Sequence, residues 1–170
     1  VVTLVKSKLT KGTSKISSKC NDFIWTKLDK NMLNTNNDLF ICNCYIPPQN
    51  KQVGSVMKNK NTPFDILQSE IQHYGAIGDL ILVGDMNSRT GEIQENTQNI
   101  TEITNDIQIE IDKEHRIRSR NNEDKTVNQY GKTLINIIED SDMVILNGRT
   151  LGDWRGKKTC HKYNGSSTVD

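Results

Sequence analysis

LILVGDMN, residues 80–87, joins four apolar residues to a polar Gly-Asp-Met-Asn ending. A short continuous apolar run is typical of a strand covered on both faces, so residues 80–83 are predicted to form a buried strand. Asp85 then lies at the sheet edge, where open α/β folds place their ligands. Together with Asn87 it offers two oxygen-bearing side chains, which suits a hard cation such as Mg²⁺ or attack on a phosphate. Taken alone, an Asp and an Asn after a strand more often form an ordinary turn.

Further strands are predicted on the N-terminal side of this stretch. Residues 22–28 (DFIWTKL) and 39–46 (LFICNCYI) are rich in apolar residues, and the Asn-rich segment between them predicts an antiparallel hairpin. The two prolines that follow end the second strand, because proline cannot donate to a sheet ladder. We also expect a strand at residues 1–6 and a polar loop at residues 11–21.

Helices are predicted on both sides of the long polar segment at residues 92–128, which we interpret as a solvated loop. The first helix begins after Thr62, which can cap it, and ends at Gly75. The second covers about residues 130–139. It is followed by a buried strand at 143–146, a basic Gly-rich loop at 148–158, and strands beginning near residues 159 and 167. Helix-to-strand units after a hairpin predict an α/β fold with mixed sheets and helices outside.

The composition sets few limits on function. The chain has 22 basic and 21 acidic residues, and this net charge of +1 neither supports nor excludes a nucleic-acid partner. The four cysteines lack a second pair at zinc spacing, so we interpret them as free thiols in an intracellular compartment, nuclear or cytoplasmic. No apolar run approaches the ~20 residues of a membrane helix. Because both ends of the sequence fall within strand-like segments, we expect a fragment of a domain.

Several further residues are candidates for a site. Tyr45 ends the strand before the prolines, Asn147 closes the strand predicted at 143–146, and Asp170 follows a short strand start. In the basic loop, Arg149 suits a phosphate contact and Trp154 a stacked base. Each of these residues has an ordinary alternative role in a core, turn or cap.

The joint order of these features resembles the endonuclease/exonuclease/phosphatase superfamily. An aromatic residue before two prolines is followed by G-D-x-N after a buried run, then by L-N-G-R, then by S-S-x-x-D. The spelling is most similar to the endonucleases of non-LTR retrotransposons. The matching stretches are DFIWTKL, LFICNCYIPP, ILVGDMNSRTGE, VNQYGKTLINI and MVILNGRTLGDWRGKKT. The resemblance makes residues 1–170 a partial domain with a variable polar insertion at about residues 92–128.

This resemblance implies a fold and an activity. The fold would be a four-layer α/β/β/α sandwich of two mixed sheets with outer helices, incomplete at both ends. The activity would be Mg²⁺-dependent (or Mn²⁺-dependent) hydrolysis of a phosphodiester, as in a DNA-nicking endonuclease. The partner would be DNA, and a reverse transcriptase domain would follow in the complete element.

The resemblance also implies roles for individual residues. Asp85 would position or deprotonate the attacking water, and with Asn87 it would belong to an incomplete set of metal ligands. Asn87 and Tyr45 would face the phosphate, and Asp170 would lie close to the catalytic His. These residues would converge at one sheet edge, in a cleft floored by Leu82. Phosphate-contacting, DNA-contacting or structural roles are implied or expected for Asn128, Asn147, Arg149 and Trp154.

The sequence also departs from the family pattern. The metal-binding Glu motif and the Ser-Asp-His motif are absent from these 170 residues, and none of the three histidines lies in a Ser-Asp-His context. Loss of some members of a cooperating catalytic set lowers the reaction rate by several orders of magnitude. We therefore expect the chain alone to lack nuclease activity. Two alternatives stay open: a phosphatase or phosphodiesterase of the same superfamily, and a non-catalytic module derived from a degenerate or reused copy.

Overall fold

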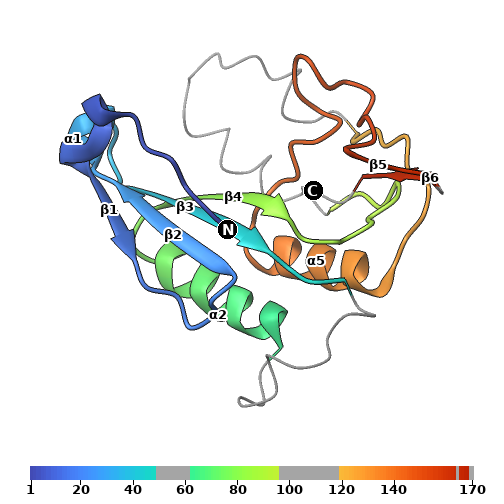
Figure 1. Ribbon diagram of the computed structural model, residues 1–170, viewed down its shortest axis with the longest axis horizontal. Coiled ribbons are helices and arrows are strands. Elements are labelled where there is room, and N and C mark those ends of the chain that lie inside the picture. The colour runs from blue at the N-terminus through green and yellow to red at the C-terminus, as the bar shows by residue number, and fades with distance from the viewer. Residues whose placement is uncertain (49–61, 96–118, 164, 169–170) are drawn as a thin grey trace. The chain divides into compact units, whose positions relative to one another are not determined.

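The computed structural model describes residues 1–48, 62–95, 119–163 and 165–168. The chain divides into two compact units, Val1–Asn87 and Ser88–Asp170, here called the N-terminal and C-terminal units. A four-stranded mixed sheet, a two-stranded sheet and helices give the chain the predicted α/β class (Figure 1). The four-layer sandwich stays a prediction.

The N-terminal unit is built on a sheet with the strand order β1-β2-β3-β4. Its strands are β1 (Thr13–Ile16), β2 (Phe23–Leu28), β3 (Leu39–Tyr45) and β4 (Asp79–Asp85). The β2–β3 hairpin is antiparallel, as predicted, and β3 pairs with β4 in parallel. The short helix α1 (Lys30–Leu33) lies between β2 and β3, and the Asp29 side chain caps it.

Two predictions near the N-terminus are wrong. Residues 1–6 form no strand, and the carbonyl of Val2 instead accepts a hydrogen bond from the side chain of Asn43 at 3.0 Å. The predicted loop at residues 11–21 contains the strand β1, which pairs antiparallel with β2 and follows the 3-10 helix η1 (Ser7–Gly12). The polar composition of this short strand hid it, since it carries little apolar alternation.

Helix α2 (Pro63–Gly75) connects β3 to β4 and packs on one face of the sheet (Figure 1). Its start matches the prediction: the Thr62 side chain accepts from the Asp65 amide, and the Asp65 carboxylate accepts from the Thr62 amide at 2.7 Å. The core between helix and sheet contains fully buried side chains, with Trp25, Cys42, Leu67 and Ile71 among them.

The opposite face of β4 is more open than expected. Ile81 and Val83 are 42% and 43% exposed, so the strand is not covered on both faces as its apolar run predicted. Leu82 pairs with the buried Cys42 and belongs to the α2 face. The expectation that Leu82 forms the floor of a cleft beside Asp85 is therefore wrong.

The C-terminal unit contains helix α5 (Gln129–Asp140) and a hairpin of β5 (Cys160–Lys162) and β6 (Gly165–Ser167). The helix lies where it was predicted, and β5 begins one residue after the predicted start at residue 159. The strand β6 ends at Ser167, near which a strand was predicted to begin. Residues 143–146, predicted as a buried strand, form none, because their amides bond elsewhere: Met143 N–H to the Ile138 carbonyl, and Ile145 N–H to the Glu95 carboxylate. In the described residues, no helix has the length and apolar character needed to cross a membrane.

Candidate active site

The carboxyl ends of the parallel strands β3 and β4 bring two predicted residues side by side. Tyr45 and Asp85 are register partners at the last position of each strand. The Ile46 amide donates to the Asp85 carbonyl at 2.9 Å, which continues the ladder one residue further. Tyr45 is 39% exposed and Asp85 is half-buried, so this edge of the sheet is accessible to solvent.

Asn87 joins this edge through a tight turn. Its amide donates to the Asp85 carboxylate at 2.9 Å, and its side-chain nitrogen donates to the Ile46 carbonyl at 2.9 Å. The backbone of Asn87 is left-handed (φ 49°), a conformation that Asn tolerates better than most residues. The side-chain nitrogen of Asn87 therefore has a structural role, because it links the end of β4 to the segment after β3.

Gly84 permits the close approach of β3 and β4 just before Asp85. It has a φ of +125°, and a Cβ built there would lie 2.0 Å from the Cys44 carbonyl oxygen. Such a distance is far inside van der Waals contact, and the obstacle is backbone that cannot rotate away. The glycine of the G-D-x-N motif is thus required by packing.

We expect Gly84→Ala to lower the free energy of unfolding by about 2 kcal/mol, through backbone strain and the clash with Cys44. Gly152→Ala is the matched control, because Gly152 also has positive φ (+95°) but nothing lies within 4 Å of its built Cβ. Urea unfolding measures the free energy of unfolding of both variants, and the m-value should stay the same in each. Equal losses for the two variants would contradict a steric role for Gly84.

The described residues do not complete a Mg²⁺ site. No group of three or more His, Cys, Asp or Glu side chains within them could hold a metal ion. At the edge of β3 and β4, Asp85 supplies one carboxylate, which already accepts the Asn87 amide. Mg²⁺ is commonly held by one or two carboxylates with waters and phosphate oxygens. Asp85 alone is therefore only a partial fit to a Mg²⁺ site.

In the C-terminal unit, Asn128 and Arg149 have structural partners. Asn128 is the N-cap of α5: its side-chain oxygen accepts from the amides of Gly131 at 2.7 Å and Arg89 at 3.1 Å. Arg149 is 5% exposed and forms an ion pair with Glu95. This geometry favours a structural role for both residues over the predicted DNA contact.

Sequence reasoning missed the buried polar core around Glu95. The Glu95 side chain is fully buried between those of Arg120 and Arg149. It accepts from Arg149 and from the Ile145 amide, while its second oxygen lies 4.0 Å from Arg120 Nε. Within the described part of the chain, neither this second Glu95 oxygen (Oε2) nor Arg120 Nε has a hydrogen-bond partner. Burial lowers the pKa of Arg120 from its usual value.

A second ion pair joins Arg89, whose side chain is 33% exposed, to the buried carboxylate of Asp124. The guanidinium donates two parallel hydrogen bonds to the carboxylate, at 2.7 and 2.6 Å, which is the strong bidentate geometry. Burial raises the pKa of Asp124, but the hydrogen bonds from Arg89 and from the amides of Thr126 and Thr168 outweigh it, so the pKa falls to about 2.

These pairs correct the prediction of a solvated loop at residues 92–128, as far as that segment is described. Residues 119–124 alternate between exposed and buried, with Arg120, Asn122 and Asp124 each 3% exposed. The burial of this stretch therefore alternates with a period of two, although every residue in it is polar. Residues 96–118 lie outside the described part of the chain.

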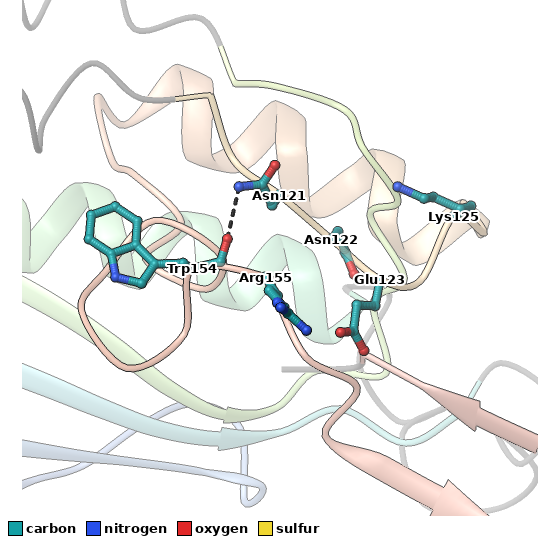
Figure 2. A pocket seen from close by; sticks show the side chains of 6 residues that line it. All are labelled: Asn121, Asn122, Glu123, Lys125, Trp154 and Arg155. Atoms are coloured by element: carbon teal, nitrogen blue, oxygen red, sulfur yellow. Dashed lines mark hydrogen bonds between the residues drawn. The ribbon is translucent and has the colours of Figure 1, made fainter.

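Of the three remaining predicted site residues, the structure describes Asn147 and Trp154. Asn147 is half-buried in a turn, and Asp170 lies outside the described residues. Trp154 is half-buried and lines an open pocket of about 540 Å³ within the C-terminal unit (Figure 2). The structure thus brings together Tyr45, Asp85 and Asn87. The convergence of this group with residues of the C-terminal unit stays a prediction.

No known protein family, curated protein or solved structure matches this chain.

Proposed function

We propose that the chain contributes the carboxyl edge of β3 and β4 to a phosphodiester-hydrolysing site that acts on DNA, as in a retrotransposon-type endonuclease. The observation that carries the proposal is the pairing of Tyr45 and Asp85 in register at an exposed strand end. A phenol and a carboxylate at one edge offer a hydrogen-bond donor for a phosphate oxygen and an acceptor for the proton of an attacking water.

In the proposed reaction, the oxygen of a water molecule attacks the phosphorus, the bond to the 3′ oxygen breaks, and this oxygen leaves as a hydroxyl group with a proton from solvent. The Asp85 carboxylate orients the water and takes its proton, and Tyr45 donates a hydrogen bond to a phosphate oxygen. Asn87 keeps the two strand ends at a fixed separation through its bonds to Asp85 and Ile46. The proposed Mg²⁺ requirement rests on the family resemblance and needs ligands besides Asp85.

Duplex DNA binding tests this proposal, because the chain alone is expected not to turn over. Without metal, the Asp85 carboxylate repels a phosphate bound at the strand ends. Asp85→Asn should therefore bind a labelled duplex roughly 5-fold more tightly at low salt in a chelator, since one charge removed at close range is worth about 1 kcal/mol. Mg²⁺ should reduce the difference between variant and wild type. Fluorescence anisotropy measures both affinities.

Asp79→Asn is the matched control. Asp79 is exposed at the opposite end of the same strand, so the substitution makes the same change in net charge away from the proposed site. We expect it to leave duplex binding within about 2-fold of wild type, because the interaction between two charges weakens with their separation. Equal effects of the two substitutions would contradict the site and favour a non-catalytic module.

A further inference from the structure

A pocket in the C-terminal unit has the chemistry of a nucleotide site. It is open to solvent, and its volume of about 540 Å³ lies within the ~300–1,000 Å³ typical of ligand sites. Figure 2 shows the indole of Trp154 at one end, Lys125 at the other, and Arg155 and Glu123 between them. The lining residues are Asn121, Asn122, Glu123, Lys125, Trp154 and Arg155.

The backbone around the pocket is held by a set of hydrogen bonds. Asn121 donates from its side chain to the Trp154 carbonyl at 2.8 Å and from its amide to the Gly148 carbonyl at 3.2 Å. The carboxylate of Asp153 accepts the amides of Gly148 at 3.1 Å and Lys157 at 2.9 Å, which closes the loop that carries Trp154. A site formed in advance loses less conformational entropy when its ligand binds.

Close packing fixes the same loop against the segment of Asn121. A Cβ at Gly148 or Gly156 would lie 1.9 or 2.1 Å from the Asn121 carbonyl oxygen. The Glu123 amide also donates to the Gly156 carbonyl at 3.0 Å. The two walls of the pocket therefore keep their separation, and Trp154 and Arg155 are presented from a constrained turn.

The charges favour an anionic ligand. Arg155 is exposed and has no acidic side chain within ion-pair distance among the described residues. Lys125 contacts Glu92 in an exposed pair, which is worth little and can exchange for another anion. Within the pocket lining, the basic residues Lys125 and Arg155 outnumber the acidic residue Glu123. Lys157 and Lys158 follow Arg155 in the same loop.

We propose that this pocket binds one nucleotide unit of single-stranded nucleic acid. The base stacks on the indole of Trp154, and the phosphate is bound by Arg155 and Lys125. An aromatic ring beside basic side chains accepts any base and follows the backbone charge, which is the general chemistry of single-strand binding. The pocket shares no residue with the edge of β3 and β4, so the inference does not rest on the proposed hydrolysis.

Tryptophan fluorescence tests the stacking directly. Trp25 is fully buried, so quenching by a ligand reports on Trp154. We expect an eight-residue oligothymidylate to quench the emission. A labelled copy should bind Trp154→Ala roughly 5- to 100-fold more weakly by anisotropy, while Trp154→Phe should retain most of the affinity. Wild-type affinity in Trp154→Ala would overturn the proposal.

A second variant does not depend on the packing of the tryptophan. Arg155→Gln should weaken oligothymidylate binding and reduce the slope of log affinity against log salt by about 0.7, because one phosphate contact is lost. Lys132→Gln is the control, since Lys132 is exposed on α5 and is not in the pocket lining. Equal slope changes in both variants would overturn the assigned contact.

Thymidine monophosphate separates a strand site from a free-nucleotide site. We expect it to bind much more weakly than the oligomer, whose neighbouring phosphates also meet Lys157 and Lys158. Equal affinity would overturn the assignment to a strand. Trp154 quenching reports on this pocket, whereas duplex binding by Asp85→Asn reports on the proposed active site, so a failure of one can be told apart from a failure of the other.

Discussion

Glu95→Gln should destabilise the C-terminal unit by about 3–5 kcal/mol, the typical cost of breaking a buried ion pair. The Glu95 side chain is fully buried, and those of Arg120 and Arg149 are 1% and 5% exposed. Without the carboxylate charge, the two guanidinium groups repel each other in a medium that screens them poorly. A loss of this size is a large share of the ~5–15 kcal/mol that stabilises most domains.

The exposed pair of Glu92 and Lys125 provides the control for this substitution. Their side chains are 61% and 64% exposed, and Glu92→Gln removes the same charge by the same chemical change. We expect it to cost under about 1 kcal/mol. Hydrogen exchange of the α5 amides and urea unfolding measure both variants. Similar losses would show that the Glu95 pair does not stabilise the unit.

The parts of the fold that were predicted correctly are those with local signals. Apolar runs located β2, β3 and β4, and the capping residue Thr62 located the start of α2. A helical period located α5 to within one residue at each end. In each case, the residues that determine the element are close neighbours in the chain.

The parts that were missed depend on distant partners. The strand β1 is defined by its pairing with β2, and its own residues are mostly polar. Residues 143–146 are apolar, but the Ile145 amide bonds to Glu95, 50 residues away, and no strand forms. The stretch that contains the buried Arg120, Asn122 and Asp124 resembles a solvated loop in composition, because these side chains are satisfied by hydrogen bonds and ion pairs rather than by apolar contacts.

The candidate site shows the same contrast between features with local sequence signals and features that depend on distant partners. A strand-end Asp and Asn are visible in the sequence, but the register that sets Tyr45 beside Asp85 follows from the β3–α2–β4 connection. A structural role was one of the alternatives expected for Asn128, but its partners at the start of α5 could not be predicted, nor could the burial of Arg149 against Glu95. Motif residues alone therefore do not distinguish a ligand contact from a cap or a buried ion pair.

Asp124→Asn should cost about 3 kcal/mol at neutral pH, because it removes the buried carboxylate charge that pairs with the partly exposed Arg89. The Asp124 side chain is 3% exposed, and its carboxylate also accepts the amides of Thr126 and Thr168. The carboxamide introduced by the substitution keeps one acceptor oxygen, so one of these donors loses its partner. An unpaired buried donor adds to the loss of the ion pair.

The pH dependence separates the charge of Asp124 from its packing. Its pKa is lowered from the ordinary 3.8 to about 2 in the folded chain, so the carboxylate stabilises the fold fully above pH ~4. That stability, about 2 kcal/mol from the difference in pKa, is lost as the pH falls through about 2. Asp124→Asn should show a smaller loss across this window than wild type. The comparison is made by urea unfolding at a series of pH values.

Asp79→Asn is again the appropriate control, because Asp79 is exposed and its substitution should change stability by under about 0.5 kcal/mol at any pH in the series. The wild-type and Asp124→Asn curves should approach each other between pH ~4 and ~2, since a protonated Asp124 no longer pairs with Arg89 as an ion. Parallel curves for the two proteins would mean that Asp124 titrates alike in the folded and unfolded chains. In that case the bidentate pair with Arg89 would not account for the stability of this unit.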